Sequence, residues 1–187
     1  MKKVVKSLSV LDVIKGRREI VRFENKEIPA EILEQVVDAG YYAPTGNNLP
    51  SRELIVITKR EGLDKLSETT PFMKWLKEAT AAIIITGRPD ESKYWLQDAS
   101  IASSFIWLTA TDLGLGLAFG AVYHSEDQEE SERRERYVRE LVGIPNNRRI
   151  VAVLGMGYPL EAPQRKKHQP REKIVHIERF SSDETKE

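Results

Sequence analysis

The sequence predicts a single globular unit that combines α-helices with β-strands. Of its 187 residues, 40% are hydrophobic and 31% are charged, which is typical of a folded chain with a core. Short apolar runs that suit buried strands are interspersed with longer segments of helical periodicity. We expect one domain over residues 1–187, with its core over about residues 10–160 and an extended tail over about residues 161–180.

Two helices are predicted in the first part of the chain. Ser9 and Asp12 have the spacing of a capping box, which opens a short helix through Ile14, and Gly16 ends it. Pro29 starts the second helix. The apolar residues of this helix follow amphipathic spacing at Ile32, Leu33, Val36 and Val37.

The stretch that follows is Ala43-Pro44-Thr45-Gly46-Asn47-Asn48-Leu49-Pro50-Ser51. Its two prolines, one glycine and two asparagines give it the chemistry of a turn-rich loop. Because its neighbours are apolar, we expect the loop to be held at both ends against the core. It is either an ordinary connection from helix to strand or a rigid loop whose amides and hydroxyl bind the edge of a flat heteroaromatic ligand.

The remaining elements are read from apolar runs and helical periodicity. Strands are predicted at Leu54–Thr58, Ala81–Thr86, Leu117–Phe119 and Ile150–Gly157. Helices are predicted at Gly62–Ser67, at about Ser92–Leu113 and at Asp127–Leu141, and a short helix or turn at Phe72–Glu78. The run Glu132–Arg136 alternates in sign, which favours a solvated helix face.

Composition excludes several classes of function. The formal net charge is zero, so there is no electrostatic case for binding nucleic acid or an anionic membrane. No cysteine is present, which rules out disulfides, thiol catalysis, iron–sulfur ligation and thiolate zinc sites. The start of the chain lacks the apolar region of a signal peptide, and we expect a cytoplasmic protein.

The side chains offer no obvious catalytic machinery of their own. The segment Gly114–Phe119 fails as a dinucleotide fingerprint, because its sixth position is Phe119 and it follows a helix. His124, His168 and His176 are far apart and lack metal-ligand spacing, so we predict no metal site and no catalytic side chain. If the protein is an enzyme, an organic cofactor supplies the reactivity.

Several stretches together resemble the FMN-dependent nitroreductase family, over about Val10 to Phe180. They are Arg17-Arg18-Glu19-Ile20-Val21-Arg22-Phe23, Ala43-Pro44-Thr45-Gly46-Asn47-Asn48, Leu113-Gly114-Leu115-Gly116, Gly143-Ile144-Pro145, Gly155-Met156-Gly157-Tyr158-Pro159 and Pro170-Arg171-Glu172-Lys173-Ile174-Val175-His176. The resemblance implies an α+β fold, a three-layer sandwich in which a central mixed sheet has helices on both faces. It also implies a homodimer with FMN at the subunit interface and a C-terminal extension that wraps the partner subunit.

The resemblance further implies a set of cofactor-binding residues. Arg17 and Arg18 would bind the FMN phosphate and ribityl end with Glu19 beside them, because guanidinium groups match phosphate oxygens. The basic residues of the tail would approach the same phosphate, namely Arg165, Lys166 and Lys167. The loop residues would flank the isoalloxazine ring from the other protomer: Pro44, Thr45, Gly46, Asn47 and Asn48. Further contacts would come from Phe119, Gly120, Gly155 and Gly157.

The implied reaction passes a hydride from NADH or NADPH through flavin N5 to a nitroaromatic, quinone or flavin acceptor. Two alternatives are a flavin-binding sensor or storage protein with slow turnover, and a family branch with a dedicated substrate, such as dehalogenation or flavin fragmentation. The chain departs from the family pattern at Glu19, Pro50 and Arg52. Glu19 has to face an arginine or a ribityl hydroxyl, or this corner of the site differs, while Pro50 and Arg52 would lie on the substrate side.

Overall fold

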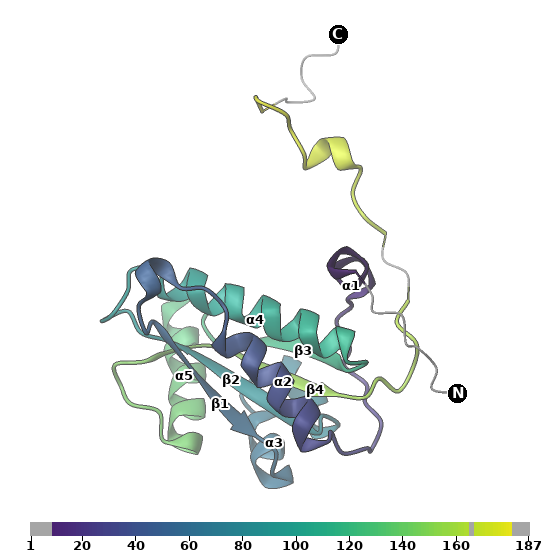
Figure 1. Cartoon of the computed structure of the whole chain (residues 1–187). Coiled ribbons are helices and arrows are strands. Elements are labelled where there is room, and N and C mark those ends of the chain that lie inside the picture. The colour runs from purple at the N-terminus through teal and green to yellow at the C-terminus, as the bar shows by residue number, and fades with distance from the viewer. Residues whose placement is uncertain (1–8, 165–166, 181–187) are drawn as a thin grey trace.

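The structure is a computed structural model that describes residues 9–164 and 167–180 (Figure 1). A four-stranded sheet in the order β1-β2-β4-β3 lies at its centre. The strands are β1 (Arg52–Ile57), β2 (Ala81–Gly87), β3 (Gly116–Ala121) and β4 (Arg149–Gly157). Every neighbouring pair is antiparallel.

The sheet differs in one detail from the mixed sheet that the resemblance implied. Among the described residues, the parallel pairing is a single bridge between Glu19 and Leu117, outside the four strands. The connection from β1 to β2, residues 58–80, begins and ends at the same end of the sheet, so β2 runs back alongside β1. β4 likewise runs in the opposite direction to each of its two neighbours, β2 and β3.

Helices cover both faces of this sheet, which confirms the α+β three-layer arrangement (Figure 1). The α-helices are α1 (Val10–Gly16), α2 (Ala30–Tyr41), α3 (Arg60–Leu66), α4 (Trp95–Asp112) and α5 (Gln128–Val142). Short 3₁₀ segments are η1 (Gly46–Asn48), η2 (Pro71–Lys77) and η3 (Arg171–Lys173). In the part of the chain that the structure describes, no helix combines the length and apolar character needed to cross a membrane.

The alternation of side chains along the strands divides the core into two clusters. On β2, Ile83 and Ile85 face α2 and α4, whereas Ala82 and Ile84 face α3, η2 and α5. All seven residues of β2 are buried, as the continuous apolar run predicts for a strand covered on both sides. The buried sheet therefore provides a fixed platform for α4 and for the loops at its ends.

Local sequence signals place most elements within a few residues. Ser9 and Asp12 form the predicted capping box, in which the Ser9 side chain accepts from the Asp12 N–H at 3.2 Å. Pro29 directly precedes α2. The start of α4 was predicted at Ser92 and lies at Trp95, because Ser92 belongs to the preceding turn, where its Oγ accepts from the Tyr94 N–H.

The interpretation of the run Glu132–Arg136 on α5 as a solvated helix face is wrong at one residue. Glu135 is 3% exposed and accepts hydrogen bonds from Arg149, from Ser131 and from the Ile150 N–H. Its neighbours Glu132 and Arg136 are exposed, as expected. Glu135 is buried because α5 packs on the sheet at β4, which supplies two of the donors.

The chain after β4 leaves the body of the molecule (Figure 1). Its apolar side chains are exposed, including Ile174, Ile177 and Phe180. That this segment wraps a partner subunit stays a prediction.

Candidate functional site

A cavity of about 680 Å³ lies where the segment after α1 passes over α4. Its lining contains the three consecutive predicted residues Arg17, Arg18 and Glu19. The other lining residues are Ile14, Ser104, Trp107 and Leu108. Gly16 ends α1 immediately before the two arginines, so the extended backbone that follows presents both to the same cavity.

The two arginines are not neutralised by acidic partners. Among the ion pairs of the described residues, none involves Arg17 or Arg18. The Arg17 guanidinium lies 4.3 Å from the centre of the Trp107 ring, and Arg18 donates to the carbonyls of Lys15 and Gln164 at 2.9 and 2.8 Å. Two oriented guanidinium groups that form no ion pair with a described carboxylate suit a phosphate, although Glu19 lines the same cavity.

Glu19 connects this cavity to the sheet edge. Its Oε1 accepts from the Phe119 N–H at 3.4 Å, and its backbone forms the parallel bridge with Leu117 on β3. Among the described residues, the Glu19 carboxylate forms no ion pair with either arginine. Whether it faces a ribityl hydroxyl or this corner differs from the family pattern stays a prediction.

The predicted loop has a specific backbone geometry. Asn47 and Asn48 both have φ of 56°, in the left-handed region that asparagine tolerates better than most residues. Both side chains are exposed, and no hydrogen bond among the described residues involves their amides. Within the described chain, the amide groups of Asn47 and Asn48 are therefore exposed and unpaired, on a left-handed backbone.

The loop borders a second cavity, of about 780 Å³. Its lining includes Pro44, Thr45 and Asn48 together with the exposed pair Tyr41 and Tyr42, whose rings meet edge to face at 4.9 Å. Arg52 also lines this cavity, but its Nη2 donates to carbonyls at the end of α2 and in the loop, those of Gly40, Tyr41 and Ala43. Burial lowers the pKa of the Arg52 guanidinium, an effect that the charge of Asp98 partly offsets.

One residue that holds this loop was missed from the sequence. The carboxylate of Asp98 on α4 bonds to Gly46 within the loop and to Ser51 at its end. The signal was present in the pattern, because Asp98 falls on the apolar stripe of its helix, three residues after Trp95 and beside the buried Ala99. An acid at a core position requires buried donors, and the loop supplies them.

The predicted glycines of the sheet are positions of close packing. A Cβ on Gly120 would collide with Met73, and one on Gly155 would collide with Trp75 and Leu76. A Cβ on Gly157 would lie 3.1 Å from Phe23. These contacts explain three glycines by packing, and their contact with a cofactor stays a prediction.

The two cavities lie on different sides of α4. The loop meets α4 at Asp98, and Arg17 meets it at Trp107, nine residues further on. Nine residues correspond to roughly 13 Å along the helix axis and about half a turn around it. Of the predicted tail residues, Arg165 and Lys166 lie outside the described residues and Lys167 is exposed, while the preceding Gln164 is held by Arg18.

The donors present fit FMN. The first cavity offers two guanidinium groups, the Ser104 hydroxyl and an indole face, which match a phosphate and a polyol chain. The loop offers unpaired amides and a hydroxyl, which match the polar edge of a flavin ring. Ser51, which lines the second cavity, donates its hydroxyl to Asp98 but is fully buried. The described residues of the two cavities can therefore bind and orient a reactive group, and none of their exposed hydroxyls has a carboxylate partner.

Comparison with known proteins identifies similar chains. The sequence model of the nitroreductase family matches residues 14–71 and 65–158. A provisionally named NADH dehydrogenase/NAD(P)H nitroreductase of Methanothermobacter thermautotrophicus is 35% identical over 162 residues, which cover 85% of this chain and 82% of that protein. The FMN reductase [NAD(P)H] of Bacillus subtilis is 24% identical, covering 96% of this chain and 75% of that protein. The structure of an FMN-dependent nitroreductase from Clostridium difficile R20291 aligns with a TM-score of 0.82 at 29% identity, covering 91% of this chain and 99% of that one.

Proposed function

The chain belongs to the nitroreductase family, and from this premise we propose that it is an FMN-dependent NAD(P)H oxidoreductase. The observation that carries the proposal is the cavity with Arg17 and Arg18, two guanidinium groups that have no carboxylate partner among the described ion pairs. An oriented pair beside an indole ring is suited to a phosphate that belongs to a ligand.

The proposed role of this chain is to bind and orient the cofactor. When bound, FMN takes up the hydride of NADH or NADPH and passes electrons on to an acceptor. Arg17 and Arg18 hold the phosphate by charge-assisted hydrogen bonds, with Lys167 and the neighbouring Arg165 and Lys166 approaching from the tail. Thr45 and the Asn48 amide orient the ring edge, while Pro44 excludes water beside it.

The acceptor is proposed to be a flat molecule, namely a nitroaromatic, a quinone or a free flavin. Pro44 and the exposed tyrosines Tyr41 and Tyr42 give the second cavity an apolar and aromatic wall that suits such a ring. Arg52 also lines this cavity, and its Nη2 donates to three backbone carbonyls, which fixes the position of this guanidinium.

We also propose that two copies of the chain share the cofactor. In one chain, the loop meets α4 at Asp98 and Arg17 meets it at Trp107, about half a turn around the helix and roughly 13 Å along it. A second copy can bring its loop to the first copy's arginines. The exposed apolar tail and the unpaired outer edge of β1 are further features that a partner subunit would cover.

The test is to purify the protein and follow its absorbance under argon. The proposal predicts a yellow protein with bands near roughly 370 and 450 nm that bleach when NADH or NADPH is added and return when a quinone or nitroaromatic is supplied. A colourless protein that binds no added FMN would contradict it. A yellow protein that never bleaches with either nicotinamide would favour a flavin-binding sensor or storage protein instead.

A further inference from the structure

The carboxylate of Asp98 bonds to two residues of the loop, Gly46 and Ser51. Oδ1 accepts from the Gly46 N–H at 2.9 Å, and Oδ2 accepts from the Ser51 hydroxyl at 2.6 Å. Asp98 is 3% exposed and Ser51 is fully buried. One side chain thus closes a ring over residues 46–51, the part of the loop that carries the two left-handed asparagines.

The start of α4 also fixes Gly46 from a second direction. A Cβ on Gly46 would lie 2.6 Å from Cδ2 of Tyr94, so the Gly46 backbone is seated directly against this ring. Tyr94 immediately precedes α4, and its carbonyl accepts from the Asp98 N–H at 2.9 Å. The Gly46 backbone is therefore held between a carboxylate and an aromatic ring that belong to the same turn.

The bonds of Asp98 are made to neutral donors. No ion pair among the described residues involves it, although the Arg52 guanidinium is near enough to feel its charge. Hydrogen bonds to a carboxylate are about twice as strong as bonds between neutral groups. Such bonds restrict the loop before any ligand arrives, which lowers the entropic cost of binding.

We propose that Asp98 is a positioning residue, which holds residues 46–51 in the geometry that the flavin ring requires. The inference rests on the proposed function. Asp98 touches neither cavity directly and acts through Gly46 and Ser51. The alternative is that Asp98 merely stabilises the fold, as any buried, hydrogen-bonded acid would.

The experiment compares Asp98→Ala, Asp98→Asn and Ser51→Ala with Glu135→Gln, which alters an acid of equal burial far along the chain. FMN dissociation constants are measured by flavin fluorescence, melting temperatures by calorimetry, and hydrogen exchange over residues 44–51 on the cofactor-free chain. We expect Asp98→Ala to weaken FMN binding by about tenfold or more and to speed loop exchange. Asp98→Asn should bind FMN more tightly and exchange the loop amides more slowly than Asp98→Ala, because the asparagine carbonyl can still accept from the Gly46 N–H.

Ser51→Ala removes only the hydrogen bond between the Ser51 hydroxyl and Asp98. This variant can be measured even if Asp98→Ala fails to fold. We expect it to weaken FMN binding by about threefold to tenfold. Glu135→Gln should lower the melting temperature and leave the FMN dissociation constant within about twofold of wild type. The inference would be overturned if Asp98→Asn and Ser51→Ala lowered only the melting temperature and left FMN affinity and loop hydrogen exchange unchanged. Failure of the wild-type protein to bind FMN would instead overturn the proposed function.

Discussion

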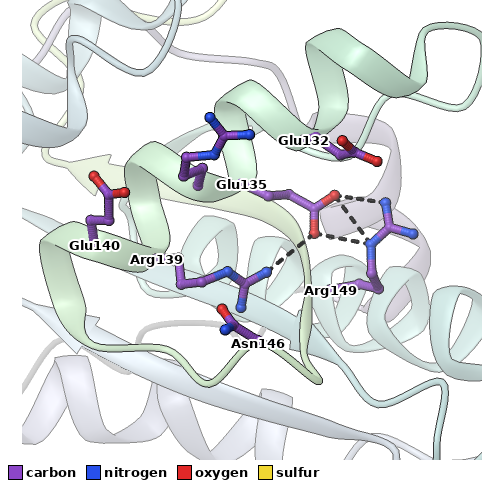
Figure 2. A pocket seen from close by; sticks show the side chains of 7 residues that line it. Glu132, Glu135, Arg139, Glu140, Asn146 and Arg149 are labelled. Carbon is purple, nitrogen blue, oxygen red and sulfur yellow. Dashed lines mark hydrogen bonds and ion pairs between the residues drawn. The ribbon is translucent and has the colours of Figure 1, made fainter.

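Asp98 and Glu135 are two carboxylates of equal burial, each 3% exposed, and they differ in one partner. Glu135 joins α5 to β4 through the Arg149 guanidinium at 2.7 Å (Figure 2) and also accepts from the Ile150 N–H at 2.9 Å, whereas no ion pair among the described residues involves Asp98. Arg139 approaches the same carboxylate at 3.9 Å. Asp98 instead joins α4 to a loop through a backbone N–H and a hydroxyl.

The difference indicates which part of the molecule is scaffold and which part is site. The hydrogen bond to Glu135 raises the pKa of Arg149, and the pair ties two core elements together. Three of the charged residues that line the cavity of about 480 Å³ beside them pair with one another, namely Glu135, Arg139 and Arg149. At the proposed site, by contrast, Arg17 and Arg18 form no ion pair and the Asn47 and Asn48 amides no hydrogen bond within the described part of the chain.

The largest expected effect belongs to the scaffold. Glu135→Ala leaves Arg149 and the Ile150 N–H without their acceptor, and we expect a loss of about 3 kcal/mol in the free energy of unfolding. Urea denaturation measures it, and Glu132→Ala on the exposed side of α5 is the control, expected within about 0.5 kcal/mol of wild type. A loss below about 1 kcal/mol for Glu135→Ala would mean that this network is not a stabilising feature.

The opposite pattern is expected at the arginines of the site. The double change Arg17→Ala and Arg18→Ala should release FMN, since each charge-assisted contact contributes about 1.5–3 kcal/mol, while the melting temperature stays near that of wild type. Flavin content after purification and FMN titration measure the effect. The matched control changes two exposed arginines of α5, Arg133 and Arg136, and should keep full flavin. Full flavin occupancy in the Arg17/Arg18 variant would show that these two arginines do not hold the cofactor and are ordinary solvated surface residues.

The smallest effect is expected at Asn48. If its amide donates to the flavin ring, Asn48→Ala removes a bond that is stronger when the ring carries extra electrons. The midpoint potential should then fall by tens of millivolts, on the scale where 30 mV is about 1.4 kcal/mol. Because φ is 56° here, alanine is also strained by about 1–2 kcal/mol.

Asn48→Gly separates the two effects of this change. Glycine accepts the left-handed backbone and lacks the amide, so it should lower the potential without the loss of melting temperature seen for alanine. If both variants keep the wild-type potential, Asn48 serves only to shape the turn.

The same comparison explains what could be predicted from the sequence. Ser9 with Asp12, Pro29 and the apolar run of β2 are local signals, and the structure confirms the elements that they predict. The charge of Glu135 was misread as solvated because its partner Arg149 lies 14 residues away on another element, which no pattern within α5 reveals. Asp98 was missed because its donors lie in a loop 47 and 52 residues earlier in the chain.

Parts of the site were predicted because the resemblance carries long-range information that periodicity lacks. It named Arg17 and Arg18, which the structure places in one cavity, and Thr45 and Asn48, which border another. It could not give the partners of residues that depart from the family pattern. Arg52 was expected on the substrate side, which stays a prediction; in the structure it lines the second cavity and its guanidinium bonds to the end of α2. Such side chains depend on the particular backbone groups that surround them.

The central claim is that Arg17 and Arg18 of one copy and the loop of another form one FMN site. Co-expression of two differently tagged chains tests it most directly, one carrying Arg17→Ala and Arg18→Ala, the other Gly46→Val, which displaces the loop from Tyr94. Each variant alone should bind no FMN. In a two-fold symmetric dimer, the mixed dimer has one site with both defects and one with neither, so the account predicts about one FMN per mixed dimer. A mixed dimer without FMN, when wild type binds about two, would show that each site is built within one chain and would contradict the account.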